Sequence, residues 1–308
     1  MDKISVIVPC YNEEESLPQF FAAAEKVRQQ MPVEFEYIFV NDGSKDRTLP
    51  ILRELQSAHS DIVHYIDFSR NFGKESAIYA GLQASTGNYV TLLDADLQDP
   101  PEMLIEMYAK IQESDIDCVA ARRFDRKGEP WLRSLFSRLF YKIMNRISET
   151  PVIDGVRDFR LMTRQMTDAI LELSEYNRFS KGLFTWVGFN TEYVAYENHE
   201  RVAGSSHWSF FSLLKYSIDG FVNFSEAPLN LAVWGGLVVV FIDIIALIFV
   251  VVRALFWHDP VSGWASTVVI ILFSFGATLL MLGIIGKYIT KIFSEVKGRP
   301  IYIVKEKK

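Results

Sequence analysis

The chain has 308 residues, a hydrophobic fraction of 49%, a net charge of −6 and a pI near 5.5. This length suits one large domain or two ordinary ones, and the acidic balance argues against a general nucleic-acid-binding protein. Its two cysteines, Cys10 and Cys118, lie in apolar runs, so we expect buried thiols in a reducing compartment and no disulfide framework. The segment Met1-Asp2-Lys3 leads directly into an apolar run without the pattern of a signal peptide, which predicts a cytoplasmic N-terminal part.

The N-terminal part of the sequence alternates between two kinds of segment. Short apolar runs typical of buried strands lie at residues 4–8, 36–40, 62–67, 89–93 and 117–121. Helical segments are expected between them, at residues 11–30, 47–58, 75–84 and 102–112. This alternation indicates βαβ units, and therefore a Rossmann-like α/β fold with a mostly parallel sheet covered by helices on both faces.

Polar clusters follow three of the predicted strands, at residues 9–13, 41–44 and 94–98. Because the carboxyl ends of parallel strands meet at one edge, where such sheets bind ligands, we expect the three clusters to lie together. Asp42 can accept hydrogen bonds from a base or ribose, and Lys74 can lie near phosphate as a point charge. Taken singly, each feature is also typical of an ordinary turn or a solvated helix start.

Asp94 and Asp96 leave the strand at 89–93 two residues apart. Adjacent carboxylates repel each other and are costly to bury unpaired, so a cation is their natural partner. Oxygen ligands favour Mg²⁺ or Mn²⁺, and Gln98 can add a neutral oxygen. Such pairs also cap helices and occupy turns, so the prediction of a metal site depends on the motifs around it.

These motifs in combination resemble family 2 glycosyltransferases with the GT-A fold. More narrowly, the whole chain is similar to the polyprenyl-phosphate glycosyltransferases, the group that includes dolichol-phosphate mannose synthases and bactoprenol glucosyltransferases. The segments that carry the resemblance are Val8-Pro9-x-Tyr11-Asn12-Glu13-Glu14, Asn41-Asp42-Gly43-Ser44-x-Asp46-x-Thr48, Asn71-x-Gly73-Lys74 and Asp94-x-Asp96-x-Gln98-Asp99-Pro100.

The resemblance implies a role for each matching position. The residues expected to bind the nucleotide sugar are Pro9, Tyr11, Asn12, Glu13, Asp42, Lys74 and Asp94. Asp96, which is also expected to be catalytic, would hold the metal with Gln98 and Asp94. Arg122, Arg133 and Ser137 match positions that bind the lipid phosphate, a task that suits an arginine fork. Arg201 is also expected to bind the acceptor phosphate. His207 stands where relatives carry Lys or Arg, and Arg201 can supply the positive charge that is then missing at the pyrophosphate.

A second motif begins at Gly155 and matches the family's Asp-Phe-Arg-Leu pattern at residues 158–161. The resemblance makes Asp158 the candidate acceptor-side carboxylate, with a catalytic role. The alternative is a helix N-cap that also forms a structural ion pair with an arginine. Residues 181–189 resemble the acceptor-side segment of the family, and a strand is expected at 192–196.

Two amphipathic segments complete the predicted catalytic domain, residues 1–225. The segment near 130–148 repeats apolar pairs at helical spacing, with basic residues between them. It fits either a helix packed on the sheet or an interfacial helix whose aromatic side enters the lipid. We favour the interfacial helix because a membrane anchor follows, and we expect a second one at 208–225.

The C-terminal part, residues 226–290, is expected to form a transmembrane hairpin. Its segments 229–252 and 264–286 are apolar and long enough to span ~30 Å of hydrocarbon. Residues 291–308 form a basic tail, so the positive-inside tendency predicts a multi-pass protein of the cytoplasmic membrane with the catalytic domain and both termini in the cytoplasm.

Within the hairpin, one charged residue and several small ones bear on assembly. Asp243 is costly in mid-span unless it faces protein, which indicates a helix–helix or subunit contact more than a transport role. The small residues Gly276, Ala277 and Gly283 permit helix association, and therefore a homo-oligomer.

The expected function is an inverting, metal-dependent transfer of a sugar from UDP-glucose or UDP-N-acetylglucosamine to undecaprenyl phosphate. The product, a polyprenyl-phosphate-linked sugar, would serve the modification of cell-envelope glycans. Two alternatives are a glycosyltransferase for another lipid or a polysaccharide, and a non-catalytic membrane scaffold or flippase subunit. Two spans without an evident channel argue against polymer export, and the intact acidic cluster argues against the scaffold.

Overall fold

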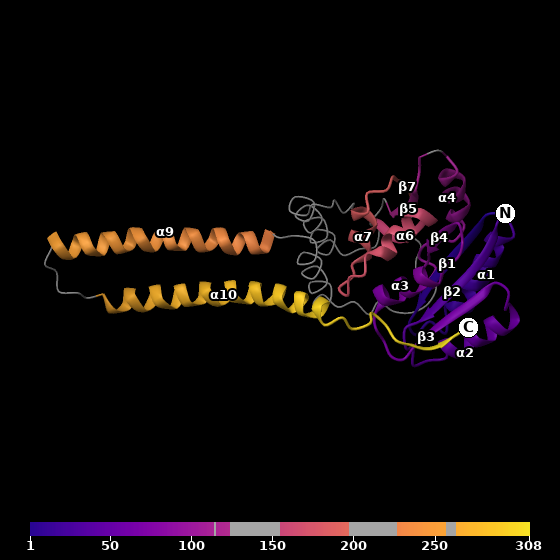
Figure 1. The fold of residues 1–308 in the computed structure, drawn as a ribbon, viewed down its shortest axis with the longest axis horizontal. Helices are drawn as coiled ribbons and strands as arrows, with labels where there is room; N and C mark the ends of the chain where they lie inside the picture. The colour runs from indigo at the N-terminus through magenta and orange to yellow at the C-terminus, as the bar shows by residue number, and fades with distance from the viewer. Residues whose placement is uncertain (114, 124–154, 197–226, 257–262) are drawn as a thin grey trace.

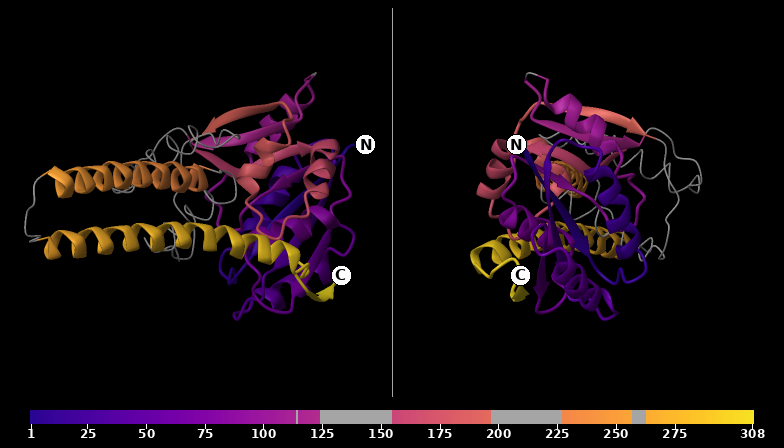
Figure 2. Two further views of the ribbon diagram at one scale, coloured as in Figure 1. Left: turned by 60° about the vertical axis from the view of Figure 1, so that its left-hand side comes forward. Right: turned by 90° about the vertical axis from the view of Figure 1, so that its right-hand side faces the viewer.

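The computed structural model describes residues 1–113, 115–123, 155–196, 227–256 and 263–308. The described chain has two parts, an α/β domain and a pair of long helices that run side by side away from it (Figure 1). The turned views in Figure 2 show the same arrangement.

The α/β domain is built on an eight-stranded sheet with the order β7-β5-β6-β4-β1-β2-β3-β8. Its strands are β1 (Lys3–Cys10), β2 (Glu34–Asn41), β3 (Val63–Phe68), β4 (Tyr89–Leu92), β5 (Cys118–Arg123), β6 (Val156–Thr163), β7 (Thr191–Tyr196) and β8 (Val304–Lys307). Strand β1 pairs in parallel with β2 and β4, β2 pairs in parallel with β3, and β5 pairs in parallel with β7. Strand β6 is antiparallel to β4 and β5, and β8 is antiparallel to β3.

Helices cover both faces of this sheet. They are α1 (Leu17–Arg28), α2 (Thr48–Ala58), α3 (Lys74–Ala84), α4 (Met103–Ile111), α6 (Arg164–Glu172) and α7 (Ser180–Trp186). Successive side chains of a strand point to opposite faces. Val6 and Val8 accordingly join one core with residues of α1, α2 and α4, while Ile7 joins another with residues of α3, α6 and α7. The predicted mostly parallel α/β sheet with helices on both faces is confirmed.

The two antiparallel strands were not predicted. Asp158 lies within β6, so the interpretation of Asp158 as a helix N-cap is wrong. Thr163, at the end of that strand, caps α6 instead, because its side-chain oxygen accepts a hydrogen bond from the Met166 amide at 3.3 Å. The C-terminal tail is more than a basic extension, since residues 304–307 form β8 along the edge of β3.

The paired helices are α9 (Ala227–Phe256) and α10 (Trp264–Val296), both longer than predicted. Each contains a stretch that is long and apolar enough to cross a membrane. Apolar side chains such as Phe241 and Phe273 are exposed along them. The prediction of two C-terminal apolar helices is confirmed.

Small residues of α9 lie at its contact with α10, and association of further helices through Gly276, Ala277 and Gly283 stays a prediction. Gly235 and Gly236 face the Met281 side chain, whereas Gly276 and Gly283 face open space. Asp243 is exposed, so α10 does not bury this carboxylate. Contact of Asp243 with a second subunit stays a prediction.

The C-terminal end of α10 is attached to the α/β domain. Glu295 accepts hydrogen bonds from the amides of Tyr176 and Asn177, at 2.9 and 3.0 Å. Further along, the Tyr302 ring stacks on Phe68 with 4.8 Å between centroids, and its hydroxyl donates to a side-chain oxygen of Gln83 at 2.7 Å. These contacts and β8 join the apolar helices to the sheet.

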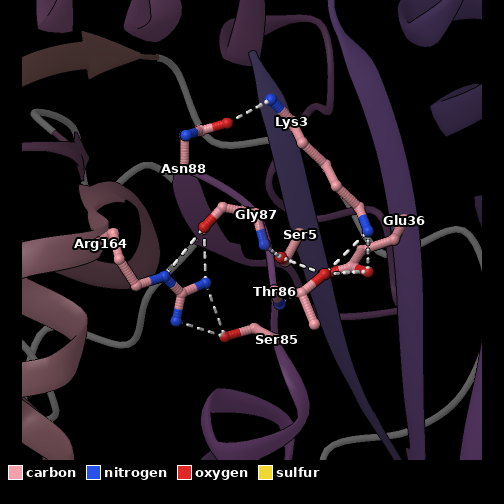
Figure 3. A network of polar contacts seen from close by, with 8 residues as sticks. All are labelled: Lys3, Ser5, Glu36, Ser85, Thr86, Gly87, Asn88 and Arg164. Carbon is pink, nitrogen blue, oxygen red and sulfur yellow. Dashed lines mark hydrogen bonds and ion pairs between the residues drawn. The ribbon is translucent and has the colours of Figure 1, made fainter. Parts of the chain in front are cut away.

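A polar network at the amino ends of the strands holds the opposite side of the sheet (Figure 3). Glu36, only 3% exposed, accepts hydrogen bonds from Ser5 and from the Thr86 amide and pairs with Lys3. Arg164 joins the same loop, since it donates to the Gly87 carbonyl at 2.6 Å. Burial alone would raise the pKa of Glu36, but Lys3, Ser5 and Thr86 lower it to about 2.

Candidate active site

Two of the predicted polar clusters are joined by hydrogen bonds at the carboxyl edge of the sheet. The Asn12 amide donates to Ser44 Oγ at 2.9 Å, and the Lys45 amide donates to Asn12 Oδ1 at 2.9 Å. Asn12 has a φ of 57°, a left-handed conformation that asparagine tolerates better than most residues. The Glu13 amide donates to Thr48 Oγ1 at 2.8 Å. The ends of β1 and β2 therefore form one connected surface, as expected from their parallel pairing.

Asp42 holds a third loop against this surface. Its carboxylate is 3% exposed and accepts the amides of Phe72 and Gly73 at 2.6 and 2.9 Å. Gly43 has a φ of +66°, and a Cβ there would lie 2.5 Å from the Arg70 carbonyl carbon, so only glycine fits. Burial raises the pKa of the Asp42 carboxyl, against the two amide hydrogen bonds.

Pro9, within β1, and Tyr11, just after it, are also predicted to bind the donor, and they differ in exposure. Pro9 is half-buried within the strand, opposite Val40 of β2. The Tyr11 side chain is 41% exposed, which leaves its ring accessible to a base.

Lys74 joins two carboxylates that come from different strands. Its Nζ lies 2.8 Å from Asp94, which follows β4, and 2.8 Å from Asp158 on β6. Because β4 and β6 are neighbours in the sheet, Asp94, just past β4, and Asp158, within β6, both reach Lys74, the first residue of α3. This ion cluster places Asp158 beside the predicted donor carboxylate, although the two are far apart in the sequence.

The charges in this cluster shift the acidities of its members. Burial alone would raise the pKa of Asp158, but Lys74 and Lys181 hold it well below its usual range. Burial would lower the pKa of Lys74, and the carboxylates of Asp158 and Asp94 raise it instead. Asp158 is therefore ionised at neutral pH.

The Asp-x-Asp segment continues into a second ion cluster that sequence reasoning missed. The backbone amide of Gln98 donates to Asp96 Oδ1 at 3.1 Å, and its side-chain Oε1 accepts from Arg157 Nη2 at 3.1 Å. Arg157 Nε lies 3.1 Å from Asp99, which is 2% exposed and also accepts from the Tyr196 hydroxyl. Burial raises the pKa of Asp99, against the effect of Arg157.

The residues of this second cluster stand in recognisable sequence segments, but their contact with one another could not be predicted from the sequence. Asp99 and Arg157 both stand in the matched motifs, and Tyr196 ends a predicted strand. Only the strand order, with β6 between β4 and β5, brings the three residues together.

The predicted metal ligands have the right chemistry for a hard divalent ion. Asp94 and Asp96 offer carboxylate oxygens, and Gln98 offers an amide oxygen. Within the described residues, no group of three or more His, Cys, Asp or Glu side chains is placed to hold a metal ion. Two carboxylates agree with Mg²⁺ or Mn²⁺, since such ions use one or two carboxylates together with substrate phosphates. These residues therefore fit the expected ion.

The predicted acceptor residues are described only in part. Arg122 is exposed near the end of β5, in register with Val156 of β6. Arg133, Ser137 and Arg201 lie outside the described residues. The same holds for His207 and for both predicted interfacial helices. Their roles stay predictions.

A pocket of about 400 Å³ opens beside Asn12, but its lining does not suit a diphosphate. It is lined by Asn12, Glu13, Glu14, Glu15, Ser16, Lys45 and Asp46. Four carboxylates against one lysine would repel an anion, so we do not assign the donor to it.

A mostly parallel sheet that carries an Asp-x-Asp pair and a further carboxylate at its carboxyl edge is typical of a GT-A-like glycosyltransferase. The chain belongs to glycosyl transferase family 2, whose family model matches residues 5–171.

Similar proteins match over nearly the whole chain. The putative glycosyltransferase CsbB of Bacillus subtilis is 45% identical over 98% of this chain and 91% of its own length. The SfII prophage-derived bactoprenol glucosyl transferase of Shigella flexneri is 40% identical over 99% of this chain and 98% of its own length. Among solved structures, glucosyl-3-phosphoglycerate synthase from Mycobacterium tuberculosis, in complex with Mn²⁺, UDP-glucose and phosphoglyceric acid, gives a TM-score of 0.45. It is 16% identical, over 70% of this chain and 76% of that chain.

Proposed function

We propose that this glycosyltransferase moves a sugar from a UDP-sugar to undecaprenyl phosphate. UDP-glucose is the first donor to test, since relatives such as that of Shigella flexneri are named bactoprenol glucosyl transferases. The observation that carries the proposal is the Lys74 bridge, which joins Asp94 at 2.8 Å to Asp158 at 2.8 Å. It links the donor carboxylates of the Asp-x-Asp segment to a carboxylate on the acceptor side.

On the donor side, the nucleotide would bind along the joined ends of β1 and β2. The exposed ring of Tyr11 can stack on the base, and the loop held by Asp42 can enclose the ribose. Asp94, Asp96 and Gln98 would hold Mg²⁺ or Mn²⁺, which when bound neutralises the departing diphosphate. Arg157 fixes the Gln98 side chain through its Oε1 at 3.1 Å, so one predicted ligand is oriented in advance.

On the acceptor side, little deprotonation is needed. A phosphate monoester is already an anion at pH 7, so its oxygen can attack the anomeric carbon directly. The new bond to this oxygen forms as the bond to the diphosphate breaks on the opposite face, which inverts the configuration. Because its pKa is held well below the usual range, Asp158 is a weak base. Asp158 would instead orient Lys74 and the acceptor, and this positioning would supply most of the rate enhancement.

The apolar helices would hold this site at the membrane. We infer that α9 and α10 cross the cytoplasmic membrane, with residues 1–225 and the tail 291–308 on the cytoplasmic side. The attachment of Glu295 to the amides of Tyr176 and Asn177 supports this arrangement, because it ties the end of α10 to the domain. A lipid acceptor could then present its phosphate without leaving the bilayer.

The first test is a transfer assay with purified full-length protein. Undecaprenyl phosphate and Mn²⁺ or Mg²⁺ are incubated with a panel of radiolabelled UDP- and GDP-sugars. We expect one donor to give a labelled lipid that mild acid cleaves. A labelled product that resists mild acid would indicate another acceptor, and silence from folded, donor-binding protein would contradict the proposal.

A matched pair of variants tests the metal assignment. Asp96→Ala should abolish transfer and Mn²⁺ binding while leaving the fold intact, and Asp61→Ala, at an exposed site outside the cluster, should change neither. Turnover like that of the wild type in Asp96→Ala would remove the metal assignment.

A further inference from the structure

Helix α7 is anchored beside the Lys74 bridge by two contacts from one of its faces. The Ser180 amide donates to Glu75 at 2.9 Å, and the Ser180 hydroxyl donates to the same carboxylate. One turn further along the same face, Phe184 lies under the Arg160 guanidinium, with 3.7 Å between its ring centroid and the guanidinium carbon. Glu75 follows Lys74 in the chain, and Arg160 lies on β6 with Asp158. The two contacts therefore pack α7 on residues that neighbour Lys74 and Asp158 in the chain.

This packing places Lys181 among the neighbours of Asp158. Lys181 lies three residues before Phe184, so the two side chains share one face of α7. Asp158 and Arg160 are two residues apart on β6 and share one face of the strand. Ser180, which precedes Lys181, binds Glu75, and Glu75 follows the Lys74 that pairs with Asp158, so Lys181 lies in the neighbourhood of this carboxylate. The charge of Lys181 accordingly contributes to the lowered pKa of Asp158.

The ammonium of Lys181 has no salt bridge or hydrogen bond with any residue in the described ranges. Its backbone carbonyl accepts a hydrogen bond from Thr185, but its Nζ is outside contact distance of Asp158 and Glu75. Asp158 is already paired with Lys74, and Glu75 with Ser180. A half-buried cation beside carboxylates that already have partners can bind an anion that arrives with a substrate.

We propose that Lys181 binds the phosphate of the acceptor lipid, beside Asp158. The inference rests on the proposed function and adds a residue to its acceptor side. Its ligand class is a phosphate monoester on a lipid. As a point charge, the ammonium needs no fixed geometry, so it can follow the phosphate oxygen as the new bond forms.

The test compares Lys181→Gln with the charge-conserving Lys181→Arg. The matched control is Lys110→Gln, which removes a lysine that lies on α4, 3.8 Å from Glu192. We expect Lys181→Gln to raise the KM for undecaprenyl phosphate about tenfold, as for one charge-assisted hydrogen bond. The KM for the nucleotide sugar should stay within about twofold. Lys181→Arg should keep most of the acceptor affinity, and Lys110→Gln should match the wild type.

Two results would overturn the assignment. One is an unchanged acceptor KM in Lys181→Gln, and the other is an equal rise in the KM of both substrates, as a structural role for α7 would produce. A binding titration that compares undecaprenyl phosphate with uncharged undecaprenol, in the presence of UDP, gives a readout without turnover. Lys181→Gln should lose the preference for the phosphate, and a retained preference would refute the assignment.

The failure of this inference can be distinguished from failure of the proposed function. If the wild-type protein transfers sugar and Lys181→Gln has an unchanged KM for the acceptor, only the role of Lys181 is refuted. If the wild-type protein binds undecaprenyl phosphate through Lys181 but forms no lipid-linked sugar, the proposed reaction is refuted and the phosphate site is retained.

Discussion

Replacing Glu36 with glutamine should remove a pH-dependent contribution to stability at the edge of the sheet opposite the active site. Glu36 is buried and accepts hydrogen bonds from Ser5 and Thr86 while it pairs with Lys3. These partners lower its pKa from 4.5 to about 2. At 1.36 kcal/mol for each tenfold change in proton affinity, this difference corresponds to about 3 kcal/mol.

The sign of the pH dependence follows from the direction of the pKa change. A carboxyl group whose pKa is lower in the folded state stabilises the fold above its unfolded value, here 4.5. The contribution is lost as the pH falls from 4.5 toward about 2, because the folded protein then takes up the same proton as the unfolded chain. The glutamine side chain of the Glu36→Gln variant has no such proton to lose, so the stability difference should disappear in acid.

Thermal unfolding of the detergent-solubilised protein, measured between pH 3 and pH 8, checks this expectation. For a domain of this size, about 3 kcal/mol corresponds to a Tm lower by roughly 6–10 °C in Glu36→Gln at neutral pH. Glu34→Gln, an exposed position on the same strand, should unfold like the wild type. A Tm difference that is the same at pH 3 and pH 7, or absent at pH 7, would refute the reasoning.

Three further changes test the site and the attachment of the C-terminal segment. Arg157→Gln leaves the buried Asp99 carboxylate without its cation and should lower the free energy of unfolding by about 3 kcal/mol, seen as a lower Tm; an unchanged Tm would contradict this. Lys74→Met removes the ammonium that competes with a metal ion for Asp94, so the affinity of the nucleotide-free protein for Mn²⁺ should rise roughly fivefold, as measured by EPR titration. Weaker Mn²⁺ binding would argue against this competition. Tyr302→Ala removes the ring stacked on Phe68 and should lower the free energy of unfolding by about 2 kcal/mol, with faster proteolysis near residue 300. Proteolysis at the wild-type rate would show that β8 stays paired without this ring.

Local sequence pattern was enough to find the strands β1 to β5 and the helices between them. Each is a short apolar run or an amphipathic segment whose side chains reflect burial on one or two faces. The same patterns predicted that Asn12, Asp42 and Asp94 would gather at one edge, because parallel strands align their carboxyl ends. The two apolar helices were equally predictable, since an apolar run of this length with at most one charge is typical of a membrane-spanning helix.

Tertiary structure alone decided the partners of the candidate site. Lys74 and Asp158 are 84 residues apart, and they meet because β6 enters the sheet between β4 and β5 in antiparallel sense. Asp99 meets Arg157 for the same reason. The register of β8 on β3 likewise joins residues that are distant in the chain, such as Glu306 and Tyr65. Such pairings depend on which strand edges remain open once the other strands have paired, and no local pattern of residues encodes that choice.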